Sequence, residues 1–134
     1  MYTQRVFEIL RAKNSDTIIA VVGASNDTSK YGSIITRKLV GHGYTVWPVN
    51  PHRAAIHGLI AYPSVTALPG MPAIVDVVTP PEVTLGVLHE CAQAGVANVW
   101  LQPGSFDQAC LDYAASAPFT TESESCIMVI AARY

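Results

Sequence analysis

Residues 17–25 read Thr17-Ile18-Ile19-Ala20-Val21-Val22-Gly23-Ala24-Ser25, an apolar and mostly β-branched run that ends in a glycine and two small residues. A short run that is apolar at nearly every position is typical of a central strand in a parallel sheet, because helices cover both faces of such a sheet. Gly23 lets the backbone turn tightly off that strand. The segment therefore predicts a buried first strand followed by an open loop.

Apolar runs and amphipathic segments alternate through the rest of the chain. Apolar residues at helical spacing predict an opening helix over about residues 3–13. We expect further strands at 44–49, 73–78, 96–101 and 119–121, a short edge strand at 59–62, helices at 29–40, 80–94 and 105–115, and an apolar tail at 126–130 that packs on the core. This order is typical of an α/β protein: a Rossmann-like three-layer α/β/α sandwich with a mostly parallel five-stranded sheet, in one domain over residues 1–134.

Two of these helices carry capping signals in the sequence. Thr79 is expected to be the N-cap, with Pro80 at the first helical position and Glu82 completing a capping box. Ser105 and Gln108 form a second capping-box pattern, which predicts a helix that opens at Ser105.

Charge is distributed unevenly along the 134 residues, of which 50% are hydrophobic and 13% charged. The net charge of −2 argues against a general nucleic-acid binder. Residues 1–53 contain seven basic and three acidic side chains, for a net +4, whereas residues 54–134 contain one basic and seven acidic side chains, for a net −6. An anion site is therefore expected in the first half.

Several classes of protein are disfavoured. No apolar run approaches the roughly 18–20 residues of a membrane helix, and the N-terminus lacks a secretory signal. Neither CxxC, HExxH nor GxSxG occurs, so no metal ligand and no catalytic residue is predicted. Cys91, Cys110 and Cys126 are expected to be buried free thiols in a reducing cytoplasm.

In parallel α/β sheets, ligands bind at the carboxyl ends of the strands, which directs attention to the loop that begins at Gly23. Small residues at Ala24 and Ser25 give an anion access to main-chain N–H groups, the next helix points its positive end there, and Lys30 adds a charge. Ser25 occupies the second glycine position of GxGxxG, so the dinucleotide fingerprint is absent. The loop is either a phosphate cradle or an ordinary strand–helix turn.

The end of the second strand reads Asn50-Pro51-His52-Arg53. NAD-binding folds usually place an acidic residue there to hold the ribose hydroxyls, so NAD is disfavoured. Arg53 either pairs with a ribose phosphate, as in NADP or coenzyme A, or is a solvated loop cation.

The two remaining loops at this edge hold further candidates. Pro80 and Pro81 present a rigid apolar surface on which an adenine ring could rest, or they simply begin a helix. Gln102 and Gly104 follow the fourth strand, where Gln102 either hydrogen-bonds a ligand or ties two loops together.

Taken together, these motifs resemble the small stand-alone CoA-binding proteins, whose fold is similar to the N-terminal CoA-binding domain of the succinyl-CoA synthetase α subunit. The resemblance extends from about Val6 to Val129, and Gly43-Tyr44-Thr45-Val46-Trp47-Pro48-Val49-Asn50-Pro51 is its most specific part. The other matching stretches are 19–25, 29–32, 79–84, 99–105 and 126–129.

The resemblance implies a nucleotide-binding protein with coenzyme A, or an acyl-CoA, lying across the strand ends. Carried over residue by residue, Gly23, Ala24 and Ser25 meet the diphosphate, with Lys30 or Tyr31 close by. Asn50 and Pro51 flank the nucleotide sugar. The adenine side is lined by Thr79, Pro80, Pro81 and Val83, and Gln102 and Gly104 border the pocket.

Binding without catalysis is the leading functional hypothesis, because the synthetase carries its phosphorylated histidine in a second domain that has no counterpart in these residues. The alternatives are a small NADP-dependent oxidoreductase that uses Arg53 and a CoA-responsive protein-interaction module. The small-molecule ligand is the expected partner, and exposed apolar faces would suit a homodimer. Cys126 is either an inert thiol, which we favour, or forms a mixed disulfide with CoA under oxidation.

Overall fold

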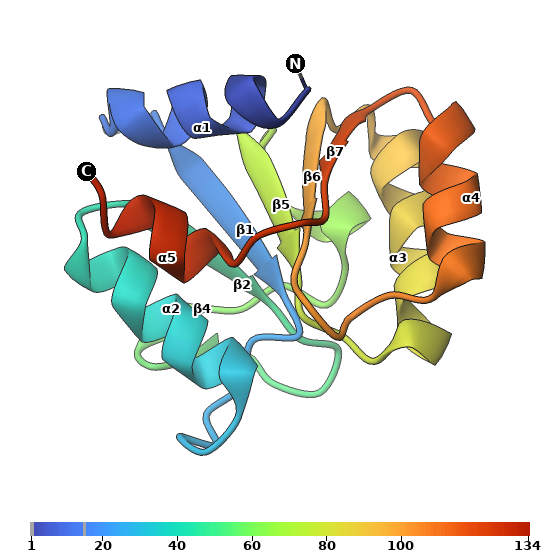
Figure 1. Cartoon of the computed structure of the whole chain (residues 1–134). Helices are drawn as coiled ribbons and strands as arrows, with labels where there is room; N and C mark the ends of the chain where they lie inside the picture. Colours follow the sequence, from blue (N-terminus) through green and yellow to red (C-terminus); the bar gives the residue numbers. More distant parts are fainter. Residues whose placement is uncertain (1, 15) are drawn as a thin grey trace.

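The computed structural model describes residues 2–14 and 16–134 and places a five-stranded sheet between two layers of helices (Figure 1). The sheet has the order β2-β1-β5-β6-β7, and every neighbouring pair is parallel. Its strands are β1 (Ile18–Val22), β2 (Thr45–Val49), β5 (Ile74–Val77), β6 (Asn98–Leu101) and β7 (Thr120–Glu122). The predicted α/β class and five-stranded sheet are confirmed, and the sheet is parallel throughout.

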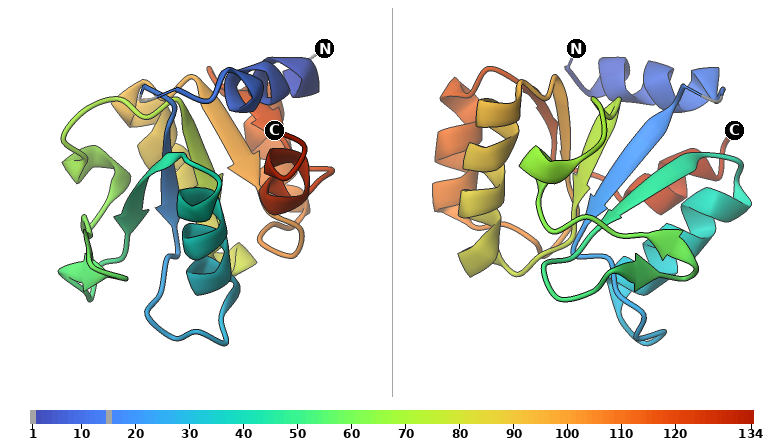
Figure 2. Two further views of the ribbon diagram at one scale, coloured as in Figure 1. Left: turned by 90° about the vertical axis from the view of Figure 1, so that its left-hand side faces the viewer. Right: turned by 180° about the vertical axis from the view of Figure 1, so that it is seen from behind.

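Helices cover both faces of this sheet, as the view from behind shows (Figure 2). One face carries α1 (Tyr2–Ala12), α2 (Tyr31–Gly41) and α5 (Ile127–Ala131), and the other carries α3 (Pro81–Ala94), α4 (Gln108–Ser116) and the 3₁₀ turn η1 (Val65–Ala67). Successive side chains of a strand point to opposite faces. In β5, Ile74 therefore packs under α1, α2 and α5, whereas Val75 and Val77 pack under α3 and α4.

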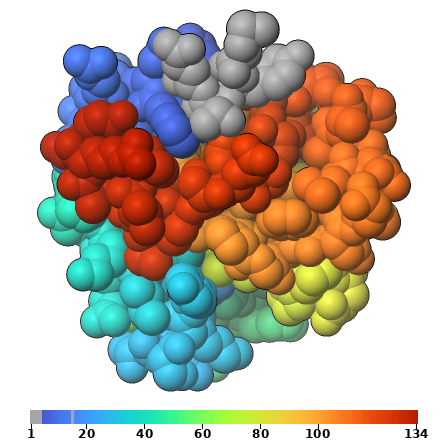
Figure 3. Space-filling model, viewed as in Figure 1, coloured from blue at the N-terminus to red at the C-terminus, as the bar shows by residue number. Residues whose placement is uncertain are grey.

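The C-terminal segment lies across the first of these faces, as expected for the apolar tail. Ile127 and Ile130 of α5 are buried beside α1 and α2. The segment that precedes α5 crosses the surface between α1 and α4 (Figure 3). Trp100 anchors it from β6, because its Nε1–H donates a 2.8 Å hydrogen bond to the Ser125 carbonyl.

The expected N-cap of α3 is wrong. The helix begins at Pro81, and the N-cap is Pro80, in an extended conformation. A proline restricts the residue before it to extended geometry, so Pro81 keeps Pro80 out of the helix. Thr79 stays outside the first turn, without a capping box to Glu82, and its hydroxyl lies 2.8 Å from that of Thr84.

The expected start of α4 is also wrong, by two residues. Asp107 is the N-cap, and its carboxylate accepts a 3.1 Å hydrogen bond from the Cys110 N–H. Ser105 instead donates from its hydroxyl to the Gln102 carbonyl at 2.7 Å. A carboxylate three residues before a free helical N–H is as strong an N-cap as a serine, and here it takes that role.

Two further boundaries differ from expectation. The helix expected from residue 29 begins at Tyr31, because the Ser29 N–H and hydroxyl both donate to Asp27 in a turn. The edge strand expected at 59–62 is shorter. Leu59–Ile60 (β4) pairs with Ala55–Ile56 (β3) in a separate antiparallel hairpin, and only Tyr62 bridges to the main sheet.

Candidate functional site

The order of the strands creates a switch point between β1 and β5. From β1 the chain continues to β2 on one side of the sheet, and it later builds β5, β6 and β7 on the other. The loops that leave β1 and β5 therefore diverge, and a crevice at such a point is where ligands bind in open α/β sheets. Gly23 ends one of these strands and Thr79 follows the other.

Gly23 is needed at this point for two reasons. Its φ of +99° is a conformation that L side chains rarely adopt. A Cβ on this residue would also lie 3.2 Å from the Thr79 nitrogen and 3.2 Å from the Val78 carbonyl carbon. The glycine thus lets the two strand ends meet backbone to backbone.

Gly32 is a site residue to which the sequence analysis gave no role. A Cβ on it would lie only 1.9 Å from the carbonyl oxygen of Gly23, so the first turn of α2 packs directly on the turn after β1. A glycine in the first turn of a helix that follows a strand and a glycine turn was the available signal, because such a glycine permits close packing of the helix on the strand. The contact places the N-terminus of α2 beside the candidate anion site.

The loop between Gly23 and α2 is held by its own side chains and by the β3–β4 hairpin. Ser25 Oγ accepts a 3.0 Å hydrogen bond from the Asp27 N–H. Asn26 donates from Nδ2 to the Ala55 carbonyl at 2.9 Å and accepts from the His57 N–H at 2.9 Å. Hydrogen bonds from Ser29 lower the pKa of Asp27, and the nearby charge of Lys30 lowers it further. An ionised carboxylate therefore lies near Lys30 at this exposed end of α2.

Asn50 connects the loops that follow β1 and β2. Its Nδ2 donates to the Ala24 carbonyl at 2.9 Å, and its Oδ1 accepts from the His52 N–H at 2.7 Å. The side chain therefore fixes the backbone on which the candidate anion site is built. Arg53 is exposed.

Two hollows meet at Thr79, one on each side of the switch point. The hollow on the β2 side has a volume of about 320 Å³, and the hollow on the β6 side has a volume of about 240 Å³. The β2-side hollow is lined by Val22, Gly23, Ala24, Ser25, Lys30, Val49, Asn50, Pro51, Pro63, Ser64, Val65, Thr79, Val83, Val87 and Glu90. The β6-side hollow is lined by Tyr31, Val78, Thr79, Pro80, Gln102, Pro103, Gly104 and Ser105.

Of the residues expected at the site, two line neither hollow: Arg53 and Pro81. The other twelve are divided between the hollows, and Thr79 is shared. Some lining residues that sequence reasoning missed are direct neighbours of expected ones at the strand ends: Val22, Val49, Val78, Pro103 and Ser105. The others come from the turn-rich segment 63–65 and from Val87 and Glu90 of α3. The spacing of Val83, Val87 and Glu90 along one helix face was the available signal.

Gln102 is buried and ties its loop to α5. Its Oε1 accepts a 2.9 Å hydrogen bond from the Ile127 N–H, and its Nε2 donates to Cys126 Sγ at 3.2 Å. The thiol of Cys126 is half-buried, contrary to the expectation that all three cysteines are buried. Cys91 and Cys110 are buried, and burial raises the pKa of the Cys91 thiol to about 12.

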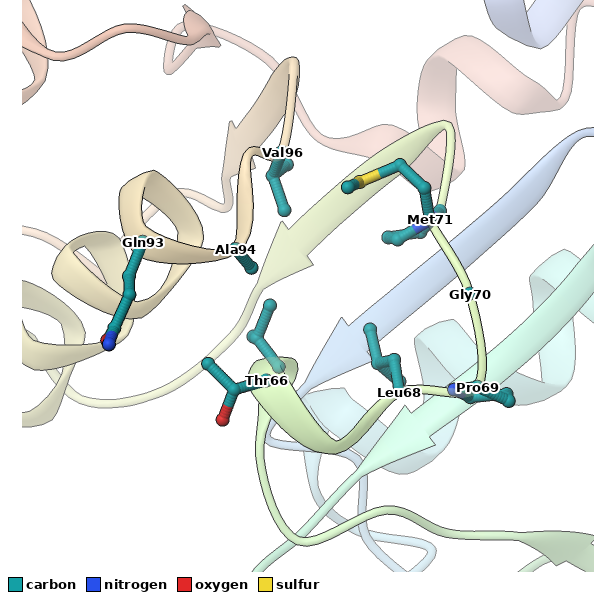
Figure 4. A pocket seen from close by; sticks show the side chains of 10 residues that line it. Thr66, Leu68, Pro69, Gly70, Met71, Gln93, Ala94 and Val96 are labelled. Atoms are coloured by element: carbon teal, nitrogen blue, oxygen red, sulfur yellow. The ribbon is translucent and has the colours of Figure 1, made fainter.

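A third hollow, of about 400 Å³, lies at the opposite edge of the sheet, near the amino ends of β5 and β6 (Figure 4). Figure 4 shows Leu68, Met71 and Val96 around it. Its lining contains no charged side chain. This hollow therefore lacks the electrostatic features of an anion site.

The described residues show neither of two other kinds of site. In residues 2–14 and 16–134, no three His, Cys, Asp or Glu side chains are grouped to hold a metal ion. None of the helices in that part combines the length and apolar character that a membrane span requires.

Comparisons with known proteins agree on one family. A family model described as CoA binding domain matches residues 17–132. The chain is 35% identical over 91 residues to the α subunit of an ADP-forming acetate–CoA ligase of Pyrococcus furiosus, which covers 67% of this chain and 20% of that subunit. The chain spans only 13% to 20% of the length of five curated relatives that it matches.

Solved structures of small proteins match over most of their length. A conserved hypothetical protein from Pyrococcus furiosus superposes with a TM-score of 0.80 at 40% identity, over 83% of this chain and 96% of that one. A protein from Thermus thermophilus superposes with a TM-score of 0.85 at 30% identity, over 99% of this chain and 98% of that one.

Proposed function

The chain belongs to the CoA-binding domain family, and from this membership we propose that it binds coenzyme A or an acyl-CoA at the carboxyl edge of its sheet. The observation that carries the proposal is the pair of hollows that meet at Thr79, on either side of the Gly23 turn and the N-terminus of α2. An elongated ligand with anionic groups in its middle matches such a site, because each end can occupy one hollow.

In this proposal the nucleotide occupies the β2-side hollow and the diphosphate lies over Gly23 and Ala24. The N-terminus of α2 and the Lys30 ammonium supply the positive charge there. The pantetheine arm then extends past Tyr31 into the β6-side hollow toward Gln102. Tyr31 is 62% exposed, so its ring is free to cover the ligand.

We propose binding without a reaction catalysed by this chain. Neither hollow is lined by a histidine or a cysteine, and Glu90 is the one carboxylate among the lining residues. The aligned residues cover only 20% of the ligase subunit that this chain resembles, so the chemistry of that subunit is not transferred to this domain. We also propose a reducing cytoplasm as its compartment, in keeping with three free thiols.

Native mass spectrometry of the protein as purified, followed by calorimetric titration with CoA, NADP and NAD, tests the proposal. We expect saturable binding of CoA, as membership of the family implies, and no heat from NAD, because no acidic side chain follows β2 to hold its ribose hydroxyls. We expect no heat from NADP either, because the GxGxxG fingerprint of dinucleotide-binding folds is absent. If NADP binds and CoA does not, the protein is a candidate oxidoreductase and the proposal is wrong.

A matched pair of variants tests where the ligand lies. Lys30 and Lys38 are both exposed, and they lie on either end of α2, about 12 Å apart along the helix axis. Lys30→Ala should weaken CoA binding roughly two- to fivefold, the size of one exposed ion pair. Lys38→Ala, which removes the same charge, should leave CoA binding unchanged, and equal losses in the two variants would contradict the placement.

A further inference from the structure

Glu90 is a charged group of the β2-side hollow to which the proposed function assigns no role. It lies nine residues after Pro81 in a helix that begins at the ligand edge, so it is about 13 Å farther from that edge along the axis. Lys30 lines the same hollow at the N-cap of α2. The hollow is thus lined by a cation near the ligand edge of the sheet and by a carboxylate farther along α3.

The carboxylate of Glu90 is held in place by one of its two oxygens. Oε1 accepts a 3.2 Å hydrogen bond from the Val65 N–H, which comes from the first residue of η1. In the part of the chain that the structure describes, the other oxygen accepts no hydrogen bond from any residue. Glu90 is half-buried, so this second oxygen is an acceptor that a ligand in the hollow can reach.

Apolar side chains form the walls between these two ends. Val83 and Val87 of α3 lie two turns and one turn before Glu90, and Pro51, Pro63 and Val65 line the hollow with them. A flat heteroaromatic ring fits between such walls, and its far edge reaches the carboxylate. An ionised carboxylate is an acceptor only, so it selects a ring edge that donates a hydrogen bond.

We propose that Glu90 selects a 6-aminopurine over a 6-oxopurine by accepting a hydrogen bond from the exocyclic amine. The inference rests on the proposed function, since it places the adenine of CoA in the β2-side hollow with its amino edge toward Glu90. On the N7 side of the 6-position adenine presents an N–H of its exocyclic amine, whereas hypoxanthine presents a carbonyl oxygen, which Glu90 repels. The N1–H donor of hypoxanthine lies on the other side of that oxygen, so the proposed contact is with the 6-position from the N7 side. Glu90 is therefore a specificity residue of the binding site.

Calorimetric binding of CoA and of its deaminated analogue, which carries hypoxanthine in place of adenine, tests this inference. The wild-type protein should prefer CoA by roughly 10- to 100-fold, as expected for a hydrogen bond to a charged acceptor. In Glu90→Gln, the amide oxygen still accepts from the Val65 N–H, while the amide N–H₂ donates to the hypoxanthine oxygen. The preference should fall to near parity or reverse.

Glu82→Gln is the control, because Glu82 is exposed on the same helix, carries the same charge and lines neither hollow. It should change both affinities by the same factor and keep their ratio. If wild-type protein binds CoA and the analogue equally well, the specificity role of Glu90 is overturned while the proposed function stands. If neither compound binds, both are overturned.

Discussion

Substituting Gly32 by alanine tests whether the turn after β1 and the first turn of α2 are in backbone contact. The added Cβ would lie 1.9 Å from the Gly23 oxygen, 2.8 Å from its carbonyl carbon and 3.1 Å from the Ala24 Cα. Ordinary contacts begin near 3.4 Å, so the two segments must move apart by about 1.5 Å. All three atoms belong to backbone, which cannot rotate away as a side chain can.

The expected cost follows from this geometry. Overpacking typically costs about 1–3 kcal/mol, and a backbone-to-Cβ clash belongs at the upper end, at about 3 kcal/mol. Unfolding entropy is roughly 2.1 cal/mol/K per residue, which gives about 0.28 kcal/mol/K for a chain of this length. Gly32→Ala should therefore lower the melting temperature by about 11 °C.

Gly86→Ala is the matched control. Gly86 also lies in a helix, but a Cβ there meets nothing within 4 Å. Replacing a helical glycine by alanine without a clash should stabilise the protein by about 0.5–1 kcal/mol, which raises the melting temperature by about 2–4 °C. Thermal melts followed by circular dichroism measure both variants, and a Gly32→Ala protein that melts at or above wild type would refute the proposed contact.

Two further predictions concern the face of the sheet under α1, α2 and α5. Asp76 in β5 is fully buried and neither carboxylate oxygen has a partner in the described residues, so burial raises its pKa well above 3.8. At pH values between the unfolded-state pKa of 3.8 and the raised folded-state pKa, the folded protein holds one more proton than the unfolded protein, so the free energy of unfolding falls by about 1.4 kcal/mol per pH unit as pH rises. Asp76→Asn should remove this slope in urea titrations from pH 4.5 to 8, and equal slopes in both proteins would count against the prediction. Trp100→Phe should cost about 1–3 kcal/mol in urea unfolding, because the half-buried Ser125 carbonyl loses the hydrogen bond that the buried Trp100 donates. Trp47→Phe, which removes no hydrogen bond among the described residues, should cost less, and equal costs would contradict this.

The fold could be predicted from the sequence because its strands are short apolar runs whose pattern is local. Residues 17–22 and 73–78 need no distant partner to be identified as buried strands. The helix starts were less predictable, since a capping pattern does not say which of two neighbouring candidates is used. Pro81 and Asp107 determined the observed starts, through a steric restriction in one case and a competing carboxylate in the other.

The site could be predicted only where its residues follow a strand. The loops after β1, β2, β5 and β6 meet at one edge in any parallel sheet, so most candidates were found. Glu90 was missed because it lies three turns into α3, away from the strand ends, and because its contact with Val65 joins residues 25 apart. Arg53 was expected at the site from its position after the second strand, and its exposed loop leaves it outside both hollows.

The two kinds of residue at this edge have different consequences for ligand choice. The backbone at this edge is shaped by Gly23, Gly32 and Asn50. The anion-binding groups of that backbone are main-chain N–H groups and the N-terminus of α2, which can bind any phosphate. Such a cradle supplies affinity for an anion but does not distinguish one nucleotide from another. In the proposed binding mode, discrimination then comes from lining side chains whose polar groups remain available to a ligand, such as Glu90 in the β2-side hollow and Tyr31 in the β6-side hollow. Substitutions in the cradle should therefore weaken all nucleotides together, whereas substitutions of the projecting side chains should change their order of affinity.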